Sequence, residues 1–334
     1  MNSARSELHK AGLRQLGPGN KVLLESAREY FDSALSAWSL ENKRIVFFRN
    51  FDSAIKYAER SMEFSRMAVE GSRNYGKFLD IEIARLRNDF TSMDKEFSSI
   101  YSRLPLIENQ RKNITQARML FSRAEFAALN DRQELSYSCL LEANELIKKV
   151  NSVCESILKE YFREFDRWEH SVDQILKESS RQKSSILVVD KYAHTCFLYR
   201  SGHMAGSFPV EFGANWIGDK QVQGDKATPE GIYSITGKKE GGGTKFHKAL
   251  LINYPNEDDR KRFLFNKRNG SIPEDANPGN LIEIHGHGGK GTDWTDGCIA
   301  LINSDMDKIY GQVGVGTKLL IVGSMRSLDE IYAD

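Results

Sequence analysis

The chain has 334 residues, with 47 Lys and Arg against 46 Asp and Glu, a formal net charge of +1, and a hydrophobic fraction of 40%. This length exceeds what one hydrophobic core commonly organises, so two domains are expected. The balanced charge gives no reason to expect nucleic acid or an anionic membrane as partner, and no apolar run reaches the roughly 18 residues that a membrane span needs.

The first half of the chain is predicted to be helical. Residues 22–179 contain one proline, Pro105, very little glycine, and apolar residues at spacings of three and four, as in AREYFDSALSAW. This periodicity predicts amphipathic helices, and we expect four to six of them, several long. Residues 1–20 are expected to be a flexible N-terminus. Residues 21–180 form the expected helical domain, which carries no chemical motif and is a candidate for binding a protein partner.

A weak internal repeat lies inside this helical half, with an offset of 90 residues. The first copy is Ala27, Arg28, Phe31, Ala34 and Ala37, and the second is Ala117, Arg118, Phe121, Ala124 and Ala127. Small residues at this spacing let antiparallel helices approach closely, as in helical-hairpin repeats. Coincidence in an alanine-rich bundle would give the same pattern.

From Ser184 the pattern changes to short strands separated by Gly and Pro turns. SILVVDKYAHTCFLYRSGH predicts two strands joined at Asp190–Lys191, and further strands are predicted in GSFPVEFG, GIYSITGKK, KALLINYP, NLIEIHG, CIALIN and KLLIVG. One helix is expected in NSDMDKIYGQV, with Ser304 as its N-cap. We therefore expect a mostly-β domain at residues 184–325 and a C-terminal tail at 326–334.

Of the four cysteines, one stands in a polar, glycine-rich setting. Cys139, Cys154 and Cys196 occupy helical or strand patterns and are expected to be small apolar core residues. Cys298 instead lies in IHGHGGKGTDWTDGCIAL, between two predicted strands. No pattern typical of a disulfide framework or a CxxC zinc site is present.

Three interpretations of Cys298 are open from the residues alone. As a nucleophile, Cys298 would use His285 at the end of the preceding strand as its base, and the N–H groups of Asp296, Gly297 and Cys298 would face an oxyanion. As a zinc ligand, Cys298 would be joined by His285, His287 and Asp296. The third interpretation is a buried structural thiol beside a surface loop.

Three sequence blocks, in this order, resemble the catalytic domain of the L,D-transpeptidases, the YkuD-like fold. They are GDKATPEGIYSIT, HKALLINYPNEDD and IHGHGGKGTDWTDGCIAL. The resemblance covers roughly residues 184–325 and none of the helical half. It implies a bacterial cell-wall enzyme with a β-sandwich-like domain. Its cysteine attacks the carbonyl of the third residue of a peptidoglycan tetrapeptide stem and releases D-Ala. An amine of a second stem then gives a 3–3 crosslink, or water gives a shortened stem.

The resemblance also assigns roles to residues of this chain. The nucleophile falls on Cys298, preceded by Gly297, and the base falls on His285, followed by Gly286, with no metal or organic cofactor. His287 is a second candidate base. The candidates for contacts with the substrate are Trp294, Asp296, Tyr254 and His287. The loop KKEGGGTKFH, residues 238–247, is expected to be flexible and to border the substrate.

Two departures from the family pattern leave the reaction outcome open. Asp296 replaces a histidine that commonly stands two positions before the cysteine, and Ala300 replaces a frequent arginine. We expect transpeptidation. The alternatives are a hydrolase of the same family, either an L,D-carboxypeptidase or an amidase that releases a wall-attached lipoprotein, and a non-catalytic interaction protein.

The implied substrate predicts where the protein is located, and the lack of a chemical motif predicts the role of the helical half. Peptidoglycan lies outside the cytoplasmic membrane, so we expect a protein of the periplasm or cell surface, with the export segment absent from this sequence. Because the helical half shows no chemical motif, a fragment beginning near Ser184 is expected to keep activity on small stem peptides.

Overall fold

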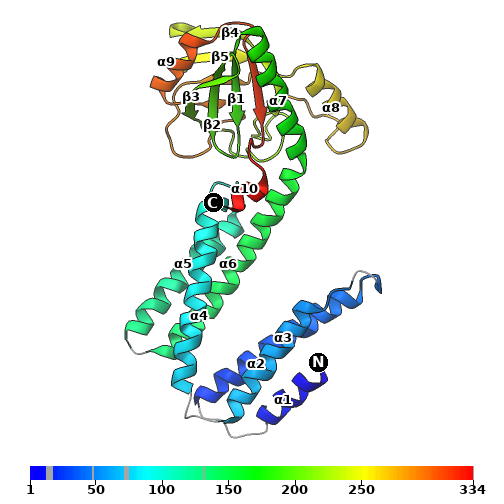
Figure 1. Ribbon diagram of the computed structural model, residues 1–334, viewed down its shortest axis with the longest axis vertical. Helices are drawn as coiled ribbons and strands as arrows, with labels where there is room; N and C mark the ends of the chain where they lie inside the picture. The colour runs from blue at the N-terminus through cyan, green and yellow to red at the C-terminus, as the bar shows by residue number, and fades with distance from the viewer. Residues whose placement is uncertain (13–17, 47–48, 71–74, 131, 334) are drawn as a thin grey trace. The chain divides into compact units, whose positions relative to one another are not determined.

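The computed structural model describes residues 1–12, 18–46, 49–70, 75–130 and 132–333. The chain divides into two compact units (Figure 1). The first unit combines Met1–Lys95 with Arg111–Lys149, and the second combines Glu96–Gln110 with Val150–Asp334. Helix gives way to strand near residue 183, close to the predicted change, but the division into units falls elsewhere. Among the described residues, no helix combines the length and the apolar character that crossing a membrane requires.

The first half is helical, as predicted. Its α-helices are α1 (Asn2–Gly12), α2 (Pro18–Asn42), α3 (Asp52–Glu70), α4 (Tyr75–Glu96), α5 (Glu108–Leu129), α6 (Gln133–Tyr161) and α7 (Phe165–Gln182). Six of these described helices, α2 to α7, lie in the region for which four to six helices were expected, so that prediction is confirmed. The additional helix is α1, which lies where a flexible N-terminus was predicted. Ala4 and Ala11 on α1 are fully buried, so packing stabilises this segment. Residues 13–17 of the same predicted segment lie outside the described residues.

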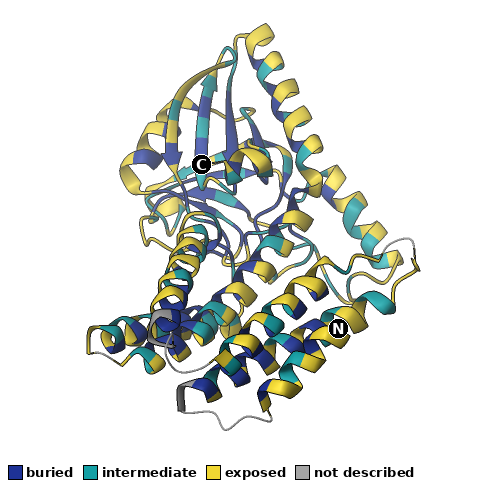
Figure 2. Cartoon of the chain, turned by 60° about the horizontal axis from the view of Figure 1, so that its bottom comes forward, coloured by how far each residue is buried: buried dark blue, intermediate teal, exposed yellow. Residues whose placement is uncertain are grey.

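Five of the six alanines of the internal repeat lie at buried positions of the first unit, and Ala37 is half-buried. Ala27 and Ala34 on α2 are fully buried, and Ser61 of α3 donates a hydrogen bond to the Ala27 carbonyl at 2.6 Å. In the second copy, Ala117 and Ala124 on α5 are also fully buried. Buried, dark-blue stretches alternate with exposed, yellow ones along the helices (Figure 2). Small side chains at corresponding positions are thus used for close packing in both copies.

The second unit contains one curled sheet of eight strands. They are β1 (Ser185–Asp190), β2 (Thr195–Arg200), β3 (His203–Pro209), β4 (Gly231–Glu240), β5 (Lys248–Ile252), β6 (Glu283–His285), β7 (Ile299–Ala300) and β8 (Lys318–Val322). Each of the predicted strands is present. The order across the sheet is β3-β2-β1-β8-β4-β5-β6-β7, with β1–β8 and β6–β7 parallel and the other pairs antiparallel.

After Ser184 the described residues form three α-helices, although the sequence predicted only one. α9 (Asn303–Gln312) is the expected helix, but it begins one residue before Ser304, its N-cap is Ile302, and no side chain caps it. The predicted cap at Ser304 was therefore wrong. α8 (Glu257–Arg268) and α10 (Leu328–Tyr332) were not predicted, and α10 occupies much of the predicted C-terminal tail. Each of these two helices begins with a capping box.

A buried polar cluster joins α6 and α7 to the sheet within the second unit. The Glu230 carboxylate accepts hydrogen bonds from the Tyr161 hydroxyl at 2.7 Å, the Trp168 indole N–H at 3.1 Å and the Lys191 ammonium at 2.8 Å. Trp168 also covers Gly323 so closely that an added Cβ would lie 2.2 Å from its ring. Helices α6 and α7 therefore complete the core of the β domain, a role that the sequence did not predict.

Candidate active site

Cys298 and His285 lie on the same face of two neighbouring strands. β6 and β7 pair in parallel, with Ile284 opposite Ile299 and His285 opposite Ala300. Cys298 precedes β7 by one residue, and side chains alternate between the faces of a sheet, so Cys298 shares the face of Ala300 and His285. The loop between the two strands was expected to fold their ends together, and the parallel pairing brings thiol and imidazole to one surface.

The His285 imidazole is buried and fixed in one orientation. Its Nδ1 lies 2.6 Å from the Gly286 carbonyl oxygen, and since a carbonyl only accepts, Nδ1 carries the proton. Nε2 is then the basic nitrogen. Phe246 stacks on the ring at 3.6 Å, and the edge of Trp294 approaches at 5.9 Å between centroids. Burial lowers the pKa of His285 below its usual 6.5, so the imidazole is neutral at pH 7 and able to accept a proton.

The Cys298 thiol is partly buried and protonated at rest. Burial is the main cause that raises its pKa above the usual 9.0, and the negative charges of Glu283 and Asp296 act in the same direction. The thiol donates a weak hydrogen bond to the Leu281 carbonyl, with sulfur and oxygen 3.7 Å apart. Among the described residues, no hydrogen bond joins this thiol to His285. A nucleophilic role requires the thiol to turn from Leu281 and a base to remove its proton.

The turn before Cys298 depends on a glycine and a threonine. Gly297 has a φ of +123°, and a Cβ at this position would lie 2.5 Å from the Ala227 carbonyl oxygen. The Thr295 hydroxyl donates to the Cys298 carbonyl at 2.7 Å and accepts the Gly297 N–H at 3.1 Å. The predicted oxyanion donor at Gly297 is therefore already engaged. Within the described part of the chain, the N–H groups of Asp296 and Cys298 have no such acceptor.

Gly286 and His287 begin the loop that leads from β6 to this turn. A Cβ at Gly286 would lie 2.7 Å from the Asn303 side-chain oxygen, which accepts the His287 N–H at 2.8 Å. Glycine is thus required at position 286 by close packing, and the backbone carbonyl of Gly286 holds His285. His287 is exposed, with φ +67°, whereas His285 is only 1% exposed. Of the two imidazoles, that of His285 is buried and anchored, whereas that of His287 is exposed.

Glu211 fixes the middle of the loop, a role that sequence reasoning missed. Its carboxylate accepts the Gly291 N–H at 2.6 Å and the Trp294 indole N–H at 2.8 Å. Its backbone exchanges two hydrogen bonds with Ala300, next to the thiol. Trp294 is thus held beside His285, where a substrate contact was predicted. Asp293 is anchored separately, by His194 at 2.9 Å.

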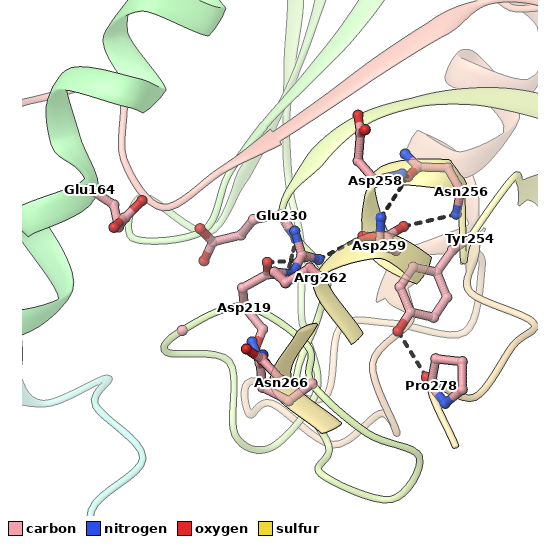
Figure 3. A network of polar contacts seen from close by, with 12 residues as sticks. Glu164, Asp219, Glu230, Tyr254, Asn256, Asp258, Asp259, Arg262, Asn266 and Pro278 are labelled. Carbon is pink, nitrogen blue, oxygen red and sulfur yellow. Dashed lines mark hydrogen bonds and ion pairs between the residues drawn. The ribbon is translucent and has the colours of Figure 1, made fainter. Parts of the chain in front are cut away.

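The two remaining predicted substrate contacts have different surroundings. Asp296 is exposed, and its negative charge contributes to the raised pKa of Cys298 after burial and Glu283. Tyr254 is buried, and its hydroxyl donates to the Pro278 carbonyl at 2.8 Å (Figure 3). Figure 3 also shows Tyr254 near Asp259 and Arg262 of α8, which are joined by a hydrogen bond of 2.7 Å. The surroundings of Tyr254 are those of a packing residue.

The zinc interpretation has no geometric support in the described part of the chain. No group of three or more His, Cys, Asp or Glu side chains there is arranged to hold a metal ion. Cys139, Cys154 and Cys196 are buried, as predicted for core residues. Cys298 is the half-buried thiol among the four cysteines.

Comparison with known proteins connects this geometry to one family. The YkuD family model, described as the L,D-transpeptidase catalytic domain, matches residues 184–321, less than half of the chain. The helical residues before 184 lie outside this match. The chain is 30% identical over 117 residues to the protein named "Putative L,D-transpeptidase YafK" of Escherichia coli strain K12, across 35% of this chain. It spans 39% of the length of that relative.

Two solved structures are similar to part of this chain. One is Bd1075 of Bdellovibrio bacteriovorus, at 20% identity and a TM-score of 0.33, covering 44% of this chain and 51% of that one. Another is an L,D-transpeptidase from Mycobacterium smegmatis, at 16% identity and a TM-score of 0.28, covering 41% of this chain and 58% of that one.

Proposed function

We propose that the second unit is a cysteine-dependent L,D-transpeptidase that acts on peptidoglycan stem peptides through a Cys298 acyl-enzyme. The observation that carries the proposal is the placement of Cys298 and His285 on one face of adjacent parallel strands, with the imidazole anchored to the Gly286 carbonyl. The match of residues 184–321 to the L,D-transpeptidase catalytic domain supports the same chemistry.

The first step uses His285 as the general base. The pKa of the thiol is raised and that of the imidazole is lowered, so the resting pair is neutral rather than a thiolate–imidazolium ion pair. Nε2 takes the thiol proton as the sulfur attacks the carbonyl carbon of the third stem residue. The Gly286 carbonyl keeps Nδ1–H in place and stabilises the imidazolium that forms.

The tetrahedral intermediate then collapses to a thioester. The N–H groups of Asp296 and Cys298 are the candidate donors to the oxyanion, since the Gly297 N–H is engaged by Thr295. The bond from the carbonyl carbon to the D-Ala nitrogen breaks, and His285 returns its proton to that nitrogen. An acceptor amine next attacks the thioester, the carbon–sulfur bond breaks, and the amine proton passes through His285 to the thiol.

Hydrolysis is the second candidate outcome, and exposed Asp296 is the observation that favours it. A carboxylate beside the thioester can orient water as a secondary base, or it can attract a protonated acceptor amine. We retain transpeptidation as the conclusion because it is the reaction that the matched domain is named for. Such a reaction places the protein in the periplasm or at the cell surface, with the first unit free to bind a protein partner.

The products of purified muropeptides test this proposal. Tetrapeptide muropeptides incubated with the full chain should yield 3–3 crosslinked dimers and free D-Ala, identified by mass spectrometry. Cys298→Ala should yield neither, whereas Cys139→Ala, which removes a buried thiol of the first unit, should retain activity. If tripeptide monomers form without dimers even at high acceptor concentration, the reaction is hydrolysis and the proposed transpeptidation is wrong. Unchanged turnover by Cys298→Ala would refute the cysteine mechanism.

A further inference from the structure

The loop after β4 brings a lysine to the candidate active site. Phe246 stacks face to face on His285, with 3.6 Å between centroids and 10° between ring planes. The Lys245 ammonium lies 5.1 Å from the centroid of the Phe246 ring, and its side chain is exposed. Burial is the main cause of the lowered pKa of His285 and of the raised pKa of Cys298, and the Lys245 charge lowers both pKa values, with the first shift and against the second. This ammonium is thus held at the rim of the thiol–imidazole pair.

A second lysine–aromatic pair contacts the same imidazole. The Lys290 ammonium lies 3.1 Å from the centroid of the Trp294 ring, whose edge faces His285 at 5.9 Å. The hydrogen bond from the Trp294 indole N–H to Glu211 holds the ring in place against the Lys290 ammonium. Two ammonium groups are therefore positioned by rigid aromatic rings that both touch the candidate base.

The nearby carboxylates form no ion pair with these two lysines. Glu283 is paired with Lys239 at 3.3 Å, and both Glu211 oxygens accept N–H groups. In the described part of the chain, Lys245 and Lys290 have no acidic partner within ion-pair distance. Their ammonium groups are free to bind an anionic ligand.

We propose that Lys245 and Lys290 form a carboxylate-binding site that selects donor peptides with free carboxylates near the reacting carbonyl. An ammonium held on a ring face still has N–H groups for a charge-assisted hydrogen bond to a carboxylate. The exposed Asp296 beside the thiol repels carboxylates from its own position, which directs them toward the lysines. The inference rests on the proposed function, because it places a peptide donor at Cys298.

Two matched donors test the selection. One is a tetrapeptide stem with free carboxylates, and the other is the same stem with those groups converted to carboxamides. Lys245→Met and Lys290→Met keep an apolar side chain on the ring and remove the charge. Each substitution should lower kcat/KM for the free-acid donor about fivefold, which is the effect of losing about 1 kcal/mol from one partly exposed ion pair. The double variant should lower it about 25-fold. The carboxamide donor should change less than about twofold, so the ratio of kcat/KM between the two donors is the readout. Lys308→Met, which removes a charge paired with Asp305 on α9, is the control and should leave both donors unchanged.

Binding to the Cys298→Ala protein separates this inference from the proposed function. Calorimetry should show tighter binding of the free-acid donor, and adding both Lys→Met substitutions should abolish that preference. The carboxylate site is refuted if Cys298→Ala binds the two donors equally. It is also refuted if the preference for the free-acid donor is undiminished after both Lys→Met substitutions are added. A lysine-dependent preference in binding without any turnover by the wild type supports the carboxylate site and refutes the proposed function.

Discussion

Substitution of Lys191 by Met should strongly destabilise the second unit. The Lys191 side chain is 0% exposed, and its ammonium donates to Glu230 at 2.8 Å and to the carbonyls of Gly218 and Thr228 at 2.6 and 2.9 Å. Met would fill much of the volume but leave a buried carboxylate without its cation and two carbonyls without their donor. Breaking one side of a buried ion pair commonly costs about 3–5 kcal/mol, so we expect a loss of about 4 kcal/mol in the free energy of unfolding.

Urea unfolding followed by tryptophan fluorescence measures this loss. Trp168 and Trp216 are almost fully buried in the second unit, so their emission reports its unfolding. The double variant Lys191→Met/Glu230→Gln removes the unpaired charge and should recover part of the stability, which gives a coupling energy for the pair. A loss below about 1 kcal/mol in Lys191→Met, or strictly additive single variants, would refute the assigned role of this cluster.

Further predictions concern the fragment, the turn, the base and the pH profile. A fragment beginning at Ser184 lacks the side chains of α6 and α7 that bond Glu230, so circular dichroism should show that it is unfolded. This differs from the expectation from sequence, and a folded, active fragment would contradict the assigned role of these helices. Gly297→Ala forces a Cβ to within 2.5 Å of a carbonyl and should lower kcat about 100-fold with the fold retained; near-normal kcat would exclude a strained turn. His285→Gln should lower kcat at least 100-fold and His287→Gln less than threefold; the reverse order would exchange their roles. Because neutral His285 is the base, kcat/KM should fall only below pH 6.5, whereas an acid limb above that pH would contradict its lowered pKa.

The strands and the buried thiols were predictable because their signals are local. Alternating β-branched runs between Gly and Pro turns located each strand, and apolar surroundings identified Cys139, Cys154 and Cys196 as core residues. α8 and α10 were missed although Asn256 and Ser327 each begin a capping box. Those helices are short or highly charged, so their apolar periodicity is weak, and only the cap signal was available.

The contacts that complete the site could not be predicted, because they join residues distant in the sequence. Strand ends placed His285 and Cys298, but Glu211 acts on Trp294 from 83 positions away. The stacking of Phe246 on His285 depends on how the loop after β4 folds back over β6. Likewise, the engagement of the Gly297 N–H by Thr295 is a matter of turn geometry that residue types alone do not determine.

Intact-protein mass spectrometry of the reaction with a tetrapeptide stem tests the central claim most directly. The full chain, quenched by acid during turnover, should carry the stem less its terminal D-Ala, and peptide mapping should locate this adduct as a thioester on Cys298. His285→Gln should accumulate the adduct much more slowly. An adduct on another residue, or one that persists in Cys298→Ala, would contradict the proposed acyl-enzyme, as would D-Ala release without any covalent species.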